Sequence, residues 1–217
     1  MVTIGFSYPR VAKYSAAGNS VTYSGGMALG RGVSVSLDVK SASDNNFYAD
    51  NRLAESETGV FTSGTATVTV DGLDNAAATL ILGLPEPESV TVNEKPVQMQ
   101  GYGDAMQPPY VGFGFVWATQ QDGVISYYPV VYPKVKFGIP GEERNTKEDQ
   151  IDWQTQELEA TVMRDDTTAH NWRRVAVTGF ATEEEALAVV DEILSITEEE
   201  ALAVVDEILS NTEEESE

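Results

Sequence analysis

The order of apolar and polar residues predicts a body built mainly from β-strands. Residues 33–39 alternate valine and leucine with serine and aspartate, and residues 65–71 alternate alanine and valine with threonine and aspartate. Successive side chains of a strand point to opposite faces, so this alternation is typical of strands with one buried and one wet face. Longer aromatic and β-branched runs at 111–118 and 124–137, separated by a Gln-Asp-Gly turn at 121–123, predict a hairpin.

Other segments add shorter elements to this body. Apolar residues within 151–163 and 172–178 predict two further strands. Residues 74–83 begin with an Asp-Asn cap, continue through alanines and end at a glycine, which predicts one short helix. The proline-rich and glycine-rich segment 84–109 is typical of a long irregular connection.

The C-terminal segment is an internal repeat. Thr182–Ser195 recurs unchanged as Thr197–Ser210, a period of 15 residues, and each copy begins with the Thr-x-x-Glu pattern of a helix capping box. The period of 15 does not fit a heptad, so we expect two short amphipathic helices broken near residue 196. The sequence therefore divides into a β domain at 1–181 and an acidic helical appendage at 182–217.

Charge narrows the choice of partners. The chain has 217 residues, with 35 acidic and 13 basic side chains for a net charge of −22; 14 of the acids and none of the bases lie in 182–217. Binding DNA phosphates needs clustered lysine and arginine, so we expect no specific binding of nucleic acid. No cysteine is present and no apolar run is long enough to cross a bilayer, so we expect neither disulfides nor membrane insertion. The N-terminus does not resemble a signal peptide.

Few residues suggest catalysis. His170 could act as a general base, and Glu157 with Glu159, or Asp165 with Asp166, could act as paired carboxylates. An exposed loop histidine and chance pairs among many acids explain the same residues. No nucleophile elbow, phosphate-binding loop, dinucleotide fingerprint or calcium loop occurs. We therefore predict a protein that is not an enzyme and needs no cofactor.

The polar faces of the two alternating strands are more informative. Their side chains are short, rich in hydroxyls and weakly acidic, so they could line a water-filled channel that does not bind the molecule passing through it. An ordinary solvent-facing sheet surface is the alternative. The candidate channel residues are Ser34, Ser36, Asp38, Thr65, Thr67, Thr69 and Asp71.

The segment between these strands, residues 41–59, is long for a hairpin connection. It combines aromatic residues with charges of both signs, which suggests a docking arm that contacts other subunits; a loop folded back on its own core is the alternative. The candidate arm residues are Asp44, Phe47, Tyr48, Asp50, Arg52, Leu53 and Glu55.

Three blocks, in order, carry a resemblance to a known family. They are Phe-Tyr-Ala-Asp-Asn at 47–51 followed by 59–73, Pro-Pro-Tyr-Val-Gly-Phe-Gly-Phe-Val at 108–116, and Tyr-Pro-Lys-Val-Lys-Phe-Gly-Ile-Pro-Gly-Glu-Glu at 132–143 with its continuation to 155. Residues 1–180 thereby resemble the major tail protein family of phages with long, non-contractile tails. The repeated C-terminal segment is not part of that pattern.

The resemblance implies a β-sandwich or partial barrel with one short flanking helix. In that family the subunits form hexameric rings, and strands of all subunits close an inner barrel. The stacked rings surround the tape measure protein, meet tail terminator and distal tail proteins at the tube ends, and let DNA pass during ejection. The expected location is the virion tail, assembled in the cytoplasm of a bacterial host.

A binding module is the main alternative. A β-sandwich adhesin or decoration protein could stack sugar rings on exposed aromatic side chains. The candidates for such stacking are Trp117, Tyr127, Tyr128 and Tyr132. The same residues also fit the packed interior of a β domain.

Overall fold

The computed structural model describes residues 2–43, 45–57, 59–93, 95–141 and 154–195, and this part of the chain forms twelve strands and two helices. The strands are β1 (Val2–Ala17), β2 (Ser20–Ala28), β3 (Gly32–Ser41), β4 (Asn45–Ala49), β5 (Arg52–Glu57), β6 (Phe61–Val70), β7 (Glu88–Val92), β8 (Lys95–Met99), β9 (Val111–Gln121), β10 (Val124–Phe137), β11 (Gln156–Met163) and β12 (Arg174–Val175). The helices are α1 (Asn75–Leu82) and α2 (Glu183–Ile193).

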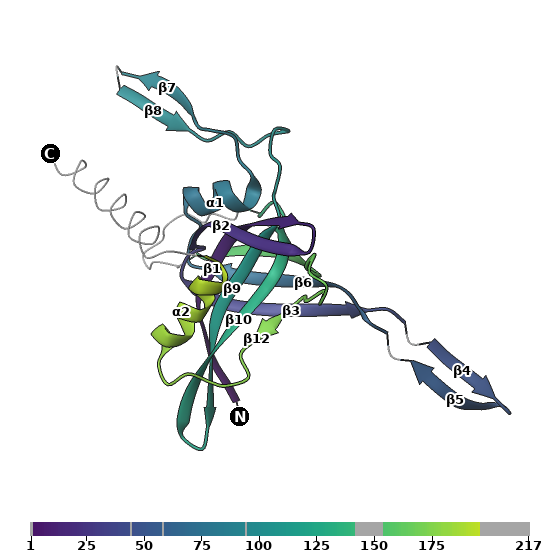
Figure 1. The fold of residues 1–217 in the computed structure, drawn as a ribbon. Coiled ribbons are helices and arrows are strands. Elements are labelled where there is room, and N and C mark those ends of the chain that lie inside the picture. The colour runs from purple at the N-terminus through teal and green to yellow at the C-terminus, as the bar shows by residue number, and fades with distance from the viewer. Residues whose placement is uncertain (1, 44, 58, 94, 142–153, 196–217) are drawn as a thin grey trace.

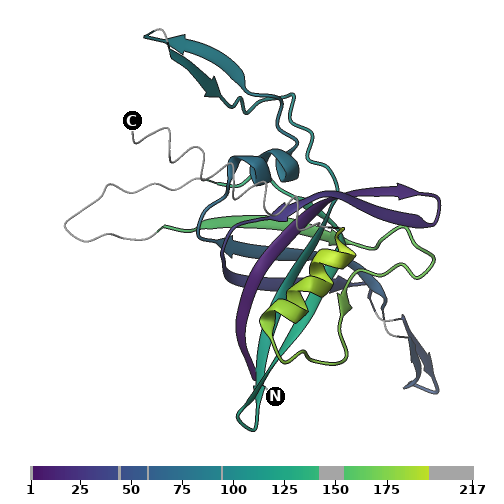
Figure 2. The same cartoon turned by 60° about the vertical axis from the view of Figure 1, so that its left-hand side comes forward.

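Eight strands form one antiparallel sheet that curves around the core (Figures 1 and 2). The strand order is β2-β1-β9-β10-β11-β6-β3, and β12 pairs with β10. The curvature brings Gly32 at the start of β3 against the Phe6 ring of β1, where a Cβ on Gly32 would lie 2.4 Å from a ring atom. The mainly β prediction is confirmed, and the sheet is not a closed barrel.

The core lies inside this curve. Its largest fully buried side chains include Phe113, Phe137, Leu158 and Ile81. Phe113 packs edge-on against Phe137, with ring centroids 6.1 Å apart. Helix α1 contributes Ile81 to this cluster, begins at the Asp74 cap and ends at Gly83 in the left-handed conformation with φ 59°, so the predicted short helix is confirmed.

Strand β1 has no counterpart in the sequence-based prediction. Its pairing with β9 shifts register between Thr3 and Gly5 and again between Ser7 and Arg10, and Tyr8 within the second shift has φ 51°. Each bulge inserts an unpaired residue and reverses the alternation of faces. Pro9 lies inside the second bulge, a position in which a strand tolerates proline. The period-two pattern is therefore too short between interruptions to be detected.

Two isolated hairpins project from the body (Figure 1). One is β4–β5, which extends from the ends of β3 and β6; the other is β7–β8, which follows α1. The second hairpin corrects the prediction that 84–109 is an irregular connection. Its two five-residue strands pair from Glu88–Met99 to Val92–Lys95 and are exposed along their whole length.

Helix α2 is the first copy of the C-terminal repeat and packs on the outer surface of β1, β9 and β10 (Figure 2). Its capping box is present: the backbone N–H of Glu185 donates to Thr182 Oγ1 at 3.3 Å, and the backbone N–H of Thr182 donates to Glu185 Oε2 at 3.3 Å. Ala186, Val190 and Leu194 are fully buried. The first copy therefore packs on the sheet of the β domain. The second predicted helix, 197–210, lies outside the described residues.

The close approach of α2 depends on two glycines of β9. A Cβ on Gly114 would lie 2.5 Å from Val190 Cγ1, and a Cβ on Gly112 would lie 2.7 Å from Leu194 Cδ2. Contacts this short do not occur for real side chains, so any larger residue would push the helix outward. At the other side of the helix, Arg10 Nε lies 3.1 Å from Asp191 Oδ1. Burial raises the pKa of Asp191, and the attraction of Arg10 only partly offsets this.

Candidate functional surface

Three adjacent strands present one continuous polar surface, here called the polar sheet face. Strand pairing aligns its members in rows of one residue each from β3, β6 and β11. The rows are Ser34–Thr69–Glu157, Ser36–Thr67–Glu159 and Asp38–Thr65–Thr161. The β3 and β11 members are exposed and the threonines of β6 are half-buried. In the first row, Ser34 Oγ donates to Thr69 Oγ1 at 3.0 Å.

The opposite side of β6 and β11 belongs to the core. Ala66, Val68 and Val70 of β6 and Leu158 of β11 are buried, so these two strands have one wet and one packed face, as the alternation predicts. The apolar side of β3 is covered only in part, because Val35 and Leu37 are half-buried while Val33 and Val39 are exposed. Six of the seven candidate channel residues lie on the polar sheet face, which brings Ser34, Ser36, Asp38, Thr65, Thr67 and Thr69 together.

Sequence reasoning missed the third strand of this surface, β11. Glu157, Glu159 and Thr161 of β11 face the same way as the β6 threonines, and Lys136 of β10 pairs with Thr161. Glu157 and Glu159 are two residues apart on one strand, so they share a face without enclosing a substrate. Their alternation with Leu158 and Ala160 was present in the sequence, but only the pairing of β11 with β6 joins them to the candidate channel residues.

The seventh candidate, Asp71, lies beyond the end of β6. Its carboxylate accepts a hydrogen bond from the Arg31 backbone N–H at 2.9 Å and forms an ion pair with the Arg31 guanidinium. Partial burial disfavours the charged form of Asp71, but these bonds from Arg31 outweigh it and lower the pKa of the carboxyl. Asp71 thus closes the β3–β6 pair at its end.

We expect Asp71→Asn to change the pH dependence of stability. A lowered pKa in the folded state stabilises the fold above the unfolded-state value of about 4, and this contribution is lost as the pH falls through the folded-state pKa. Because the Arg31 side chain is exposed, the loss at pH 7 should be at most about 1 kcal/mol. Urea unfolding from pH 7 to pH 2 should show a shallower acid limb in the variant. An acid limb of the stability curve that is unchanged in Asp71→Asn would contradict a stabilising role for the Asp71–Arg31 ion pair. Arg31→Met removes the other side of the same ion pair and serves as the second variant.

The β4–β5 hairpin, here called the arm, corresponds to the predicted docking segment. Asp50 and Asn51, with φ 50° and 60°, form its two-residue turn. The Phe47 and Tyr48 side chains are 62% and 64% exposed. The arm extends away from the body and is not folded back on the core (Figures 1 and 2). An isolated two-stranded hairpin is marginally stable in water, so this geometry favours a role in contacts with another molecule.

The remaining arm candidates are placed by the same hairpin. Arg52 pairs with Ala49, Leu53 with Tyr48, and Glu55 with Phe47. Because cross-strand partners emerge on the same side, Phe47 and Glu55 share one face of the arm. Asp44 lies outside the described residues, and so does Trp153 of the predicted strand at 151–163.

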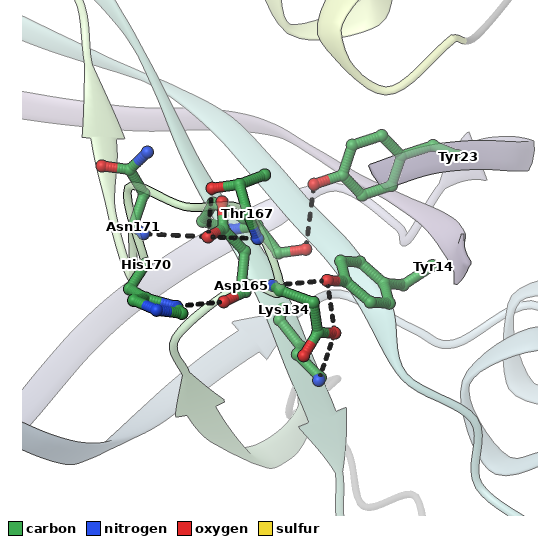
Figure 3. Close-up of polar contacts among 9 residues, drawn as sticks. Tyr14, Tyr23, Lys134, Asp165, Thr167, His170 and Asn171 are labelled. Atoms are coloured by element: carbon green, nitrogen blue, oxygen red, sulfur yellow. Dashed lines mark hydrogen bonds and ion pairs between the residues drawn. The ribbon is translucent and has the colours of Figure 1, made fainter. Parts of the chain in front are cut away.

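The loop around His170 is held by Asp165 (Figure 3). The buried Asp165 carboxylate accepts hydrogen bonds from the Thr167 hydroxyl at 2.7 Å and from the Asn171 backbone N–H at 2.9 Å. His170 is exposed, and its Nδ1 lies 3.3 Å from the Asp165 carbonyl oxygen. The carboxylate and the imidazole therefore serve the loop turn, and neither is aligned with a nucleophile in the described contacts.

The neighbouring carboxylate joins this loop to the sheet. Asp166 accepts a hydrogen bond from the Tyr14 hydroxyl at 2.8 Å and lies 2.6 Å from Lys134 Nζ. Lys134 and Tyr14 together lower the pKa of Asp166, and burial raises the pKa of Tyr14 to about 12. The Lys134 ammonium also lies 4.7 Å from the centroid of the Tyr110 ring. Asp165 and Asp166 are thus separate anchors of one loop rather than a catalytic pair.

The aromatic residues considered for sugar stacking do not form an open platform. Tyr132 is buried and packs against Phe113 with ring centroids 6.1 Å apart. Trp117 and Tyr128 are partly buried, and Tyr127 is tied by backbone pairing to Phe180. The set is therefore divided between packing and one cavity, which Trp117 and Tyr132 both line.

A scan against protein-family models finds no family that matches the chain, and a search of curated proteins finds no relative. Within the described residues no group of three or more His, Cys, Asp or Glu side chains could hold a metal ion. In the same part of the chain neither helix is long and apolar enough to span a membrane.

Proposed function

We propose that this chain is the subunit of a phage tail tube, a structural virion protein that assembles into stacked hexameric rings. The observation that carries the proposal is the polar sheet face, in which hydroxyls and a few carboxylates cover one side of three paired strands while the other side of β6 and β11 packs the core. Such strands suit a barrel wall with a wet lumen. The three sequence blocks that resemble the major tail protein family support the same proposal.

The open ends of the sheet fit assembly. β2 and β3 are the edge strands of the sheet within the described residues. Exposed edges invite pairing with other chains, and closing a ring of subunits would cover them. The arm, with its exposed Phe47 and Tyr48, would contact a neighbouring subunit or ring. Tape measure, tail terminator and distal tail proteins would be the further partners.

Charge suits the passage of DNA. A weakly acidic lumen would repel phosphates and let DNA slide without binding. At physiological salt this repulsion extends only about 8 Å, so only charges at the lumen wall would act on the DNA. Asp38, Glu157 and Glu159 are the carboxylates of the polar sheet face.

Electron microscopy of the purified protein tests the proposal. We expect hollow rings or tubes at high protein concentration, with a mass by light scattering that is a multiple of six subunits. Added crude particle extract should lengthen the tubes if an initiator complex is needed. A protein that stays monomeric in both conditions, and that antibody labelling does not find in any virion tail, would contradict it.

A further inference from the structure

A cleft opens between the edge of β3 and the first half of β1. Residues 2–7 of β1 pair with β9 on one side, and β2 pairs only with β1 residues from Arg10 onward. β3 pairs with β6 on one side, and the described residues provide no strand on the other. Between these two edges lies a cavity of about 560 Å³.

The wall of the cleft combines a strand edge with aromatic side chains. The five consecutive residues Val33–Leu37 of β3 all line the cleft. Successive side chains of a strand point to opposite faces, so a cavity that meets every residue in turn lies along the edge of β3 and not over one of its faces. Phe6, Phe115, Trp117 and Trp172 supply the aromatic wall. The volume is in the range of binding pockets, and apolar walls with few polar groups are typical of them.

Two polar groups in this wall have no acceptor in the described part of the chain. They are the Nε1–H of Trp117 and the Nε–H of Arg173, both buried. The Arg173 guanidinium carbon lies 5.0 Å from the centroid of the Trp117 ring, and Arg173 forms no ion pair with the described residues. Buried donors are nearly always paired in native proteins, so this cleft fits an occupant that brings an acceptor, and a carboxylate suits the cation best.

The arm has the complementary chemistry. Phe47 is exposed and shares a face with Glu55, so one side of the hairpin offers an aromatic ring beside a carboxylate. The hairpin pairs with no other strand of the described chain. We propose that the cleft between β1 and β3 receives the arm of a second copy, with Phe47 against the aromatic wall and Glu55 paired with Arg173. This proposal rests on the proposed function, because it names the receiving surface for the arm in the tube.

A charge swap tests the pairing. Glu55→Arg and Arg173→Glu should each reduce the yield of assembled tubes by about tenfold or more, because each places like charges together in a desolvated contact. The double variant should recover most of the wild-type yield. Glu88→Arg, on the exposed β7 strand of the other hairpin, is the matched control and should assemble normally. Circular dichroism of each variant separates failed assembly from failed folding.

Cross-linking tests the same contact without charge changes. The chain has no cysteine, so Phe47→Cys with Val35→Cys introduces one thiol on the arm and one in the cleft, and only a bond between the two kinds can link more than two copies in series. We expect oxidation to link neighbouring copies into a ladder on a denaturing gel, and Phe47→Cys with Val177→Cys, which is 98% exposed outside the cleft, should not do so.

The outcomes distinguish the two proposals. The docking of the arm would be overturned, and the tube retained, by three results together. The wild-type protein forms tubes, the double cysteine variant gives no cross-link, and the double charge variant does not restore assembly. If the wild-type protein never forms rings or tubes, but the variant with Phe47→Cys and Val35→Cys still links two copies by a disulfide, the tube would be rejected and the contact retained. Assembly lost in each single variant and restored in the double variant would support both.

Discussion

Val190→Asp should strongly lower the free energy of unfolding of the protein. Val190 is fully buried between α2 and β9, and its Cγ1 fills the space left by Gly114. The substitution removes an apolar contact and places a carboxylate in a cluster formed by Ala12, Val116 and Val131. We expect a loss of at least about 3 kcal/mol in the free energy of unfolding. Urea unfolding followed by tryptophan fluorescence measures it.

The repeat provides an unusually close control. Val205 occupies the same position in the second copy as Val190 in the first, within an identical stretch of 14 residues. Val190 is the member of this pair that lies in the described core, so Val205→Asp is the matched comparison at the identical position of the second copy. An equal loss in both variants would show that the second copy is also part of the core. If Val190→Asp and Val205→Asp are each harmless but the double variant is unstable, either copy of the repeat can occupy the packing site on β1, β9 and β10.

Local patterns predicted the elements that local physics determines. The alternation in β3 and β6 reflects two faces with different solvent exposure, and the β9–β10 hairpin reflects its Asp122-Gly123 turn, with φ 52° and 83°. The capping box of α2 was equally visible, because it needs only residues three positions apart. These features require no knowledge of the rest of the chain.

The features that sequence reasoning missed depend on interruptions or on distant partners. Pro9 and two bulges break the pattern of β1, and Pro96 lies within the β7–β8 hairpin, where it suggested a loop. The contribution of β11 to the polar sheet face depends on the register between β11 and β6, which lie about 90 residues apart along the chain. Register is set by the shared core on the opposite face, so it is not readable from either strand alone. Glu157 and Glu159 therefore looked like an isolated acidic pair.

The polar sheet face determines which carboxylates are suitable for a test of DNA passage. Asp71 was an equal candidate with Asp38 in the sequence, but its ion pair with Arg31 at the strand end makes it a poor probe of the lumen. Asp38, Glu157 and Glu159 are exposed on one face, so all three can be reversed without removing a described core contact. A triple change to lysine should leave the fold and the assembled tube intact.

We expect this triple lysine variant to form normal tails that release DNA at least about tenfold more slowly, because each ring would present a cationic wall to the phosphates. The delay should shrink as salt rises, since counterions compete for both surfaces. The matched control reverses Glu86, Glu88 and Glu184, three exposed acids outside the polar sheet face, with the same change in net charge. Fluorescence of released DNA measures the rate. Equal rates in both variants, with intact tails in the microscope, would remove the polar sheet face from the lumen and assign it to the outer wall of the tube.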